Sequence, residues 1–182
     1  MKKISEHILF EGKWLRLKRA VFLNAAGEEV VWESVERKDL PDSIVIIPKL
    51  VPSGKFVLIK QFRHPLEKYV IGFPAGLYAG DLNHALKELK EETGYTGRIV
   101  DASPELKANS GMTNMSTRVV YAEIDENAPV NKYPEQELEP SEDIEVLLVE
   151  KKDMKGFLMS EYEKGAEIGA GLWYIFVTGP ML

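Results

Sequence analysis

The stretch Gly80–Tyr95, GDLNHALKELKEETGY, carries the pattern that decides the fold of this chain. Apolar residues recur there at helical spacing, which predicts an amphipathic helix over 81–93; they are Leu82, Ala85, Leu86 and Leu89. At about 100° per residue, Glu88, Glu91 and Glu92 fall within one sector of that helix. We therefore expect the helix to bury its apolar stripe and to present the clustered carboxylates on the opposite side.

This acidic cluster has the chemistry of a site for a hard divalent cation. Like charges four positions apart on a helix repel by roughly a few tenths of a kcal/mol. A bound cation would remove that repulsion, and donor sets of oxygen alone suit Mg²⁺, with Mn²⁺ as an alternative. The competing interpretation is a solvated acidic face that binds no ligand, which is the commoner fate of such a pattern.

The residues on either side of the helix complete a longer motif. Phe73-Pro74-Ala75-Gly76 is predicted to form a turn before the helix, and Thr93-Gly94 supplies a C-cap glycine after it. Together these parts resemble the Nudix box, the signature of hydrolases that cleave nucleoside diphosphates linked to another group. The family motif reads Gly-x5-Glu-x7-Arg-Glu-apolar-x-Glu-Glu-x-Gly-apolar. Its second half matches Glu88 to Tyr95, with Lys87 at the arginine position.

The first half of this box is shorter than the family pattern. The glycine of Pro-Ala-Gly is Gly76, which lies about three residues too close to Lys87. Asp81 is the candidate for the early glutamate of the motif, although it is out of register. Lysine also cannot copy the planar, two-pronged contact that arginine makes with carboxylates. These departures bear on the rigidity and metal affinity of the site more than on the presence of the chemistry.

The composition is that of an ordinary globular protein. The sequence has 182 residues, of which 45% are hydrophobic and 29% charged, enough for one domain with a sizeable core. It has no cysteine, which excludes disulfides and zinc-thiolate sites and fits a reducing cytoplasm, the location we expect. We expect no membrane association, because no signal-like or long apolar run occurs. The net charge of −6 argues against a nucleic-acid partner, and an anionic substrate would need arginines or cations.

Strand-like runs flank the helix on both sides. They are predicted at 14–23, 29–37, 44–50, 55–62, 118–124 and 144–149, with a turn at 24–27, a loop over 125–141 and an interrupted helical pattern from Asp153. This order predicts an α/β sandwich, and the resemblance implies the Nudix α-β-α layered fold. We divide the chain into residues 1–40, a small N-terminal antiparallel sheet, and residues 41–182, the Nudix catalytic domain.

Motifs outside the box narrow the resemblance to one branch of the family. Four motifs resemble the ADP-ribose pyrophosphatase branch. They are Gly12-Lys13-Trp14, Trp32-Glu33-Ser34-Val35, Ile59-Lys60-Gln61-Phe62-Arg63 and Phe73-Pro74-Ala75-Gly76-Leu77. Members of that branch are homodimers that exchange N-terminal sheets, and they stack an adenine ring between aromatic residues of that region. The resemblance therefore implies a homodimer and a nucleoside diphosphate sugar as substrate.

Trp14 and Trp32 are the candidates for the adenine contact. Both belong to the predicted hairpin, where opposite or diagonal positions come close, and each indole stacked on a purine contributes about 1–3 kcal/mol. With the resemblance, we expect the two tryptophans to come from different protomers. Glu33 could accept a hydrogen bond from the exocyclic amine, although alternation places it on the other strand face from Trp32. On spacing alone, coverage of a core or a dimer interface is the commoner role for both tryptophans.

Two arginines and one loop complete the expected substrate site. Arg37 and Arg63 lie at predicted strand ends and are the candidates for the pyrophosphate, because a guanidinium binds phosphate oxygens in two-pronged fashion. The alternative for either is a weak surface ion pair. The resemblance adds Gly76 and also Met112, which belongs to the loop 109–114 in the place of a substrate-contacting loop of the family.

The resemblance also implies how the glutamates divide the work. The metal ligands that it implies are Glu88, Glu92, Glu91 and the carbonyl oxygen of Ala75. The branch takes one more glutamate, as base or as an extra ligand, from a mobile loop between late strands. The catalytic candidates are Glu142, which matches that position best, Glu139 as the second choice, and Glu91 as a ligating or orienting group. A solvated acidic loop is the alternative for the loop residues.

The sequence thus predicts metal-dependent hydrolysis of the pyrophosphate bond of ADP-ribose or a related nucleoside diphosphate sugar, giving AMP (or another nucleoside monophosphate) and a sugar phosphate. Two alternatives stay open. One is a different substrate, such as GDP-mannose. The other is a non-catalytic Nudix domain that senses a nucleotide, which the shortened box favours slightly and the retained glutamates oppose. A purely structural domain would leave the tryptophan and arginine positions unexplained.

Overall fold

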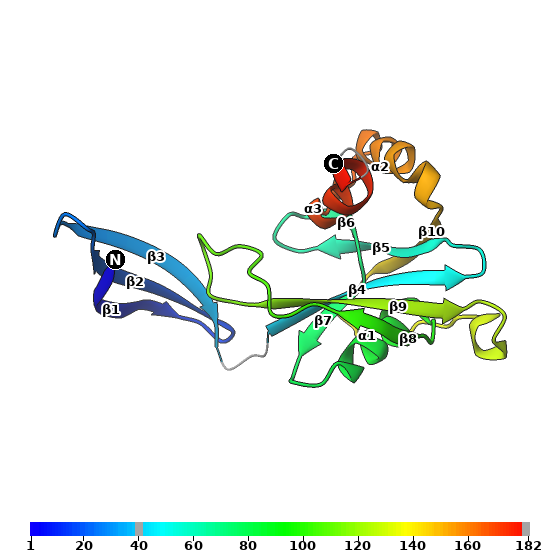
Figure 1. The fold of residues 1–182 in the computed structure, drawn as a ribbon, viewed down its shortest axis with the longest axis horizontal. Coiled ribbons are helices and arrows are strands. Elements are labelled where there is room, and N and C mark those ends of the chain that lie inside the picture. Colours follow the sequence, from blue (N-terminus) through cyan, green and yellow to red (C-terminus); the bar gives the residue numbers. More distant parts are fainter. Residues whose placement is uncertain (39–41, 180–182) are drawn as a thin grey trace.

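The molecule consists of a three-layered body and a small sheet that projects from one end of it (Figure 1). The computed structural model describes residues 1–38 and 42–179. The body has a mixed β-sheet with helices on both faces, so the predicted α/β sandwich and its small N-terminal antiparallel sheet are confirmed. No helix within the described ranges is long and apolar enough to cross a membrane.

The projecting sheet is formed by β1 (Lys2–Glu11), β2 (Leu15–Leu23) and β3 (Glu29–Arg37), paired antiparallel in that order. The side chain of Asn24 accepts hydrogen bonds from the backbone N–H groups of Ala26 and Glu28 and so closes the predicted β2–β3 turn. β1 is an addition to the predicted strands. Two register shifts along it break the alternation that would have marked it as a strand.

The body contains the remaining strands, with β4 and β9 pairing in parallel at its centre. These strands are β4 (Asp42–Val51), β5 (Phe56–Arg63), β6 (Lys68–Gly72), β7 (Ala75–Tyr78), β8 (Arg98–Ala102), β9 (Thr117–Asp125), β10 (Ile144–Val149) and β11 (Glu167–Ile168). Their order is β11-β6-β5-β4-β9-β8, with β7 on β4 and β10 on β5. Because β5 pairs antiparallel with both β6 and β10, side chains of these three strands share faces.

Helices cover the two faces of this sheet separately (Figure 1). The predicted helix is α1 (Asn83–Thr93), which ends at Gly94 in the left-handed conformation at φ 78°. It packs on an apolar cluster that includes Ile44, Ile46 and Val120. The other face carries α2 (Met154–Glu163), α3 (Ala170–Leu172) and the π-helical segment η3 (Trp173–Thr178), preceded by the 3₁₀ turn η2 (Lys151–Asp153). A second 3₁₀ turn, η1 (Pro129–Asn131), follows β9 and bonds to Thr96 after α1.

The structure corrects the prediction just before α1. Ala75 and Gly76, expected in a turn, begin β7 and pair with Val45 and Ile44 of β4. Small residues have low strand propensity, which hid this strand in the sequence. β6, β8 and β11 are further additions, each too short to show a clear alternation. The predicted domain boundary between residues 40 and 41 falls outside the described residues.

Candidate active site

The side of α1 that carries Glu88 and Glu92, here called the acidic edge, faces the interior of the protein and not the solvent. Glu92 is only 2% exposed and Glu88 is half-buried. Seven positions separate Ala85 from Glu92, which is about two helical turns, so Glu92 continues the buried apolar stripe. The expectation that the carboxylates lie opposite that stripe was therefore wrong for Glu92. The buried edge of α1 faces β7, which is the strand that α1 contacts most extensively.

Gly76 lets the Glu88 carboxyl group lie directly on the backbone of β7. A Cβ atom added at Gly76 would lie 2.0 Å from the Glu88 carboxyl carbon and 2.2 Å from its Oε1. These separations are far inside van der Waals contact, so a side chain at position 76 would displace the carboxylate. The predicted place of Gly76 in the site thus has a steric reason.

Glu92 is held by the same strand through a hydrogen bond. The backbone N–H of Ala75 donates to Glu92 Oε2 at 2.9 Å. The pKa of Glu92 is raised from 4.5 to about 8, chiefly by burial. The carboxylates of Glu142 and Glu88 also raise it, whereas the Ala75 hydrogen bond and the Arg63 charge lower it. Burial, followed by Glu91, also raises the pKa of Glu88. These shifts favour the protonated forms of both carboxyl groups in the metal-free protein, and a bound cation would favour their charged forms.

Glu91 points along the outside of the helix to Lys87. Lys87 Nζ lies 2.9 Å from Glu91 Oε1 and 3.0 Å from Oε2. This ion pair raises the pKa of Lys87, and it uses the residue at the family's arginine position to hold Glu91 away from Glu92. The role of Glu91 as a ligand or an orienting group stays a prediction.

The loop between η1 and β10 is fastened to the C-terminal end of α1. Gln136 Nε2 donates to the backbone oxygen of Glu92 at 2.6 Å and to that of Ile144 at 3.1 Å. The N–H of Glu137 donates to the Glu91 carbonyl at 2.8 Å. A Cβ atom at Gly94 would lie 2.5 Å from the backbone nitrogen of Glu135, so glycine permits this close approach as well as its positive φ.

This fastening brings the predicted loop glutamates toward the acidic edge. Glu142 is near enough to raise the pKa of both Glu88 and Glu92. Glu139 lies farther out, where its charge acts on Lys87. The two are joined in one turn, because the N–H of Glu139 donates to Glu142 Oε2 at 2.9 Å and the N–H of Glu142 donates to the Glu139 carbonyl at 2.9 Å. Glu142 is thus the closer of the two to the acidic edge, and its catalytic role stays a prediction.

The donor chemistry of this edge fits a hydrated divalent cation that prefers oxygen ligands. No group of three or more His, Asp or Glu side chains in residues 1–38 and 42–179 is arranged to hold a metal by itself. Mg²⁺ keeps several waters, however, and is commonly bound through one or two carboxylates together with substrate phosphates. Glu88 and Glu92 supply such carboxylates. Gln61, 8% exposed on the same face of β5 as Arg63, adds a buried Oε1 with no hydrogen-bond partner.

The two predicted arginines occupy different places. Arg63 ends β5 beside the acidic edge, where its charge lowers the pKa of Glu92. Arg37 ends β3 and lines a pocket of ≈ 220 Å³ together with Asp42, Asn109 and Thr113. The structure therefore brings Arg63 to the carboxylates directly, and it places Arg37 beside the loop that was expected to contact substrate.

That loop docks on the projecting sheet. Trp32 Nε1 donates to the Gly111 carbonyl at 3.0 Å, and the N–H of Val35 donates to the Met112 carbonyl at 2.9 Å. Met112 and Trp32 are both more than half exposed, so the predicted substrate-binding residues at this position present free surface. Glu33 lies between Trp32 and Ser34 on β3 and is exposed on the other face, as alternation required.

The two tryptophans of one chain do not form a sandwich. Trp32 pairs across the hairpin with Ala20, whereas Trp14 precedes β2 and its carbonyl accepts from the N–H of Lys38. Six residues separate Trp14 from Ala20, which corresponds to about 20 Å of strand. The idea that they occupy opposite or diagonal positions was therefore wrong. They are 55% and 53% exposed, and the ammonium of Lys13 lies 4.5 Å from the centre of the Trp14 ring.

Sequence reasoning missed several residues that shape the site. Gln136 sits in a loop without periodicity, and no local signal marks its two backbone contacts. Tyr69 of β6 donates its hydroxyl hydrogen bond to Asp143, next to Glu142. Gln61 lies within a motif but has no signal of its own in the sequence, and its buried, unpaired oxygen is a property of the tertiary structure.

Comparison with known proteins agrees with this geometry. No family model matches the chain. The chain is 36% identical to putative nudix hydrolase 2 of Caenorhabditis elegans over 85% of its own length and 74% of the relative. It is 31% identical to the ADP-sugar pyrophosphatase of Mus musculus, with 82% and 73% covered, and 40% identical to the ADP-ribose pyrophosphatase of Saccharomyces cerevisiae, with 76% and 64% covered.

The fold has a counterpart among solved structures. A structure described as an ADP compounds hydrolase matches with a TM-score of 0.66 at 19% identity, covering 91% of this chain and 96% of that one. The two chains therefore share their fold. The chain belongs to the Nudix hydrolase family, whose members act on pyrophosphate bonds.

Proposed function

We propose that this enzyme is a metal-dependent ADP-ribose pyrophosphatase that hydrolyses ADP-ribose to AMP and ribose 5-phosphate. The observation that carries the proposal is the edge formed by Glu88 and Glu92 against the Ala75–Gly76 backbone, with Arg63 alongside. Relatives named ADP-ribose pyrophosphatase and ADP-sugar pyrophosphatase support an ADP-linked substrate.

Mg²⁺ is the cation we propose for this edge, with Mn²⁺ as a substitute. The ligands would be the carboxylates of Glu88 and Glu92, with the Ala75 carbonyl and Glu91 as further candidates. Such an ion neutralises phosphate charge and lowers the pKa of water. The raised pKa values of Glu88 and Glu92 support this assignment, because burial disfavours their charged forms in the protein alone and a bound cation would stabilise those forms.

The chain's own residues would bind, orient and move the proton. The Arg63 guanidinium would bind a phosphate oxygen beside the acidic edge, and Arg37 would bind the substrate from the pocket that it lines. Glu142 would take the proton from the attacking water, since it is the loop carboxylate nearest to Glu88 and Glu92, and Glu139 is the second candidate. The loop contact of Gln136 holds this segment over the edge.

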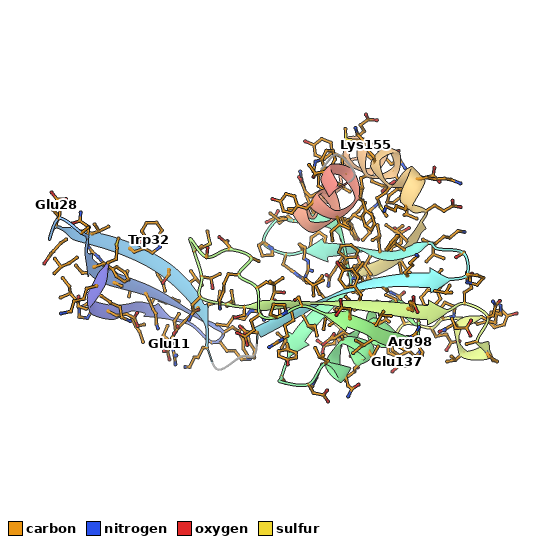
Figure 2. All side chains as sticks on the ribbon, in the orientation of Figure 1. Glu11, Glu28, Trp32, Arg98, Glu137 and Lys155 are labelled. Atoms are coloured by element: carbon orange, nitrogen blue, oxygen red, sulfur yellow. The ribbon has the colours of Figure 1, made fainter. Side chains whose placement is uncertain are left out.

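The adenine site requires a second protomer. Trp32 lies on the projecting sheet, at the other end of the molecule from Glu137 in the loop beside α1 (Figure 2). Trp14 and Trp32 of one chain are too far apart to hold one purine between them. In a homodimer that exchanges N-terminal sheets, Trp14 of one chain and Trp32 of the other would stack the base, with Glu33 at its amine. Exposed apolar side chains on the sheet support such an interface; they are Ile4, Ile8, Leu9, Phe10, Leu15 and Val31.

The remaining assignments follow from the composition. The net charge of −6 opposes nucleic-acid binding, and the absence of cysteine suits a reducing compartment such as the cytoplasm. The principal competitor is a related hydrolase with another nucleoside diphosphate sugar, such as GDP-mannose. The pocket beside Arg37, with Asn109 and Thr113, is where we expect that choice to be made.

A substrate panel tests the proposed function. ADP-ribose, GDP-mannose, UDP-glucose and NADH are incubated with the enzyme and Mg²⁺, and the nucleoside monophosphates are separated by chromatography. We expect ADP-ribose to give the highest kcat/KM. A higher kcat/KM for another sugar nucleotide would change the assigned substrate but not the assigned active site. Tight ADP-ribose binding without cleavage would favour a nucleotide-sensing domain.

A further inference from the structure

The loop residue Glu142 is followed by a residue that belongs to the opposite face of the sheet. The β10–β5 register pairs Ile144 with Gln61, and the N–H of Phe62 donates to the Asp143 carbonyl at 3.1 Å. Continued by one more residue, the register places Glu142 opposite Arg63. Side-chain alternation extended to this position puts Glu142 on the α1 side with Arg63, in agreement with the effect of its charge on Glu88 and Glu92. Asp143 lies on the other side, where its carboxylate bonds to Tyr69.

On that other face, Tyr69 reaches across β5 to Asp143. Tyr69 pairs directly with Phe62 in the β5–β6 ladder, so Asp143, Phe62 and Tyr69 form one row across three strands. The Tyr69 hydroxyl donates to Asp143 Oδ2, and this bond raises the pKa of Tyr69. The Phe62 ring packs edge-on against the rings of Tyr69 and His64, with centroid distances of 5.5 Å and 5.4 Å. This packing fixes the tyrosine ring over the strand.

The segment that carries Glu139 and Glu142 is therefore fastened at both ends. At its start, Gln136 and Glu137 bond to the backbone at the end of α1. At its end, Asp143 is bonded through its carbonyl to Phe62 and through its carboxylate to Tyr69. The β10 ladder begins only at Ile144, so the Tyr69 bond acts on the first residue beyond the regular strand.

We propose that Tyr69 and Asp143 are positioning residues that fix Glu142 over the acidic edge from the opposite face of the sheet. Holding the Asp143 side chain on the Tyr69 side sets the alternation of the segment, and that alternation directs Glu142 toward Arg63 and Glu92. Neither residue touches the reacting atoms. The inference rests on the proposed function only in taking Glu142 as the catalytic group.

A double-mutant cycle on the full-length enzyme tests this coupling. Loss of one hydrogen bond to a charged group allows the segment to leave its position most of the time, so Tyr69→Phe lowers kcat by about tenfold and leaves KM within about twofold. In a Glu142→Gln background, Tyr69→Phe causes no further loss, because both act through one group. Asp143→Ala behaves as Tyr69→Phe does, and Asp143→Asn, which keeps an acceptor, recovers part of the loss.

Controls separate positioning from folding. Tyr69→Phe keeps the ring that packs on Phe62, and thermal unfolding is expected to stay unchanged. Tyr174→Phe removes a hydroxyl from a 69% exposed tyrosine on η3 and is expected to leave kcat and KM unchanged. Multiplicative losses in the Tyr69→Phe/Glu142→Gln double variant, or full kcat in Tyr69→Phe, would overturn the proposal.

Hydrogen exchange provides a readout that does not depend on activity. Amides of residues 137–143 should exchange faster in Tyr69→Phe than in the unmodified protein, while those of α2 stay unchanged. Equal exchange rates of residues 137–143 in both proteins would contradict the proposal that the Tyr69–Asp143 hydrogen bond, here called the clamp, fixes this segment. If the unmodified enzyme hydrolysed no sugar nucleotide, the proposed function would fail, whereas faster exchange in Tyr69→Phe would still support the clamp as a feature of the fold.

Discussion

The Glu88 carboxyl group lies so close to Gly76 that a Cβ atom there would come within 2.0 Å of its carboxyl carbon. The contact joins the first helix of the body to the strand before it, although the segment between Gly76 and Lys87 is shorter than the family motif. The shortened box therefore still brings its glycine and its first glutamate together.

Gly76→Ala should remove activity while the protein stays folded. The added methyl group would displace Glu88 by an ångström or more, and a misplacement of about 1 Å at a reacting centre can cost about 100-fold in rate. The measurement is kcat with ADP-ribose and Mg²⁺, together with circular dichroism. Gly156→Ala is the matched control, because position 156 in α2 has open space for a Cβ atom. A Gly76→Ala enzyme with normal kcat would place the chemistry elsewhere.

The metal-free enzyme should lose stability as the pH rises. Folding raises the pKa of Glu92 from 4.5 to about 8, so between these values the folded state holds a proton that the unfolded state has released. The free energy of unfolding therefore decreases with pH across that window. We expect the urea midpoint in chelator to fall between about pH 5 and about pH 8.

Glu92→Gln should flatten this pH dependence and abolish turnover, because the amide stays neutral. Glu163→Gln, at an exposed position of α2, is the control and should keep the slope. Added Mg²⁺ should raise the midpoint of the unmodified protein at about pH 8, since a ligand that binds only the folded state stabilises it. An unchanged slope in Glu92→Gln would remove Glu92 as its source.

Trp32→Ala should raise KM for ADP-ribose more than it lowers kcat. Loss of one base stack weakens binding by about 1–3 kcal/mol, or roughly fivefold to 150-fold in KM. Trp32→Phe keeps a ring but loses the indole N–H that bonds Gly111, so it separates stacking from loop docking. If both variants kept the KM of the unmodified enzyme, Trp32 would have no part in substrate binding.

The enzyme should be a dimer in solution. The projecting sheet leaves large apolar side chains exposed, among them Phe10 at 67%, and exposed apolar patches of this kind mark interaction sites. Light scattering at micromolar concentration should give twice the chain mass of 20.6 kDa. A monomer that hydrolyses ADP-ribose with normal KM would contradict an adenine site shared between protomers.

Much of the fold could be read from periodicity. The runs at 29–37 and 144–149 match β3 and β10 residue for residue, because both are rich in β-branched and other apolar residues typical of strands. β1 and β7 could not be predicted, since register shifts mask the first and small residues make up half of the second. Local patterns fail where tertiary pairing overrides propensity.

The sequence allowed us to name candidate residues for the site but not the contacts that those residues make in the fold. The spacing of Glu88 and Glu92 identified an acidic edge, yet the charge of Glu92 favoured a surface position although its place in the helix continues the apolar stripe. The clamp formed by Tyr69 and Asp143 joins residues 74 positions apart. Such contacts depend on strand order, which a single sequence does not reveal.

The most direct test of the central claim is AMP release from ADP-ribose in Mg²⁺ and in excess chelator, with Glu92→Gln measured alongside. We predict rapid release in Mg²⁺, none in chelator, and at most a trace from Glu92→Gln in either condition. Equal release in Mg²⁺ and chelator, or undiminished release by Glu92→Gln, would contradict a metal-dependent hydrolase built on the acidic edge of α1.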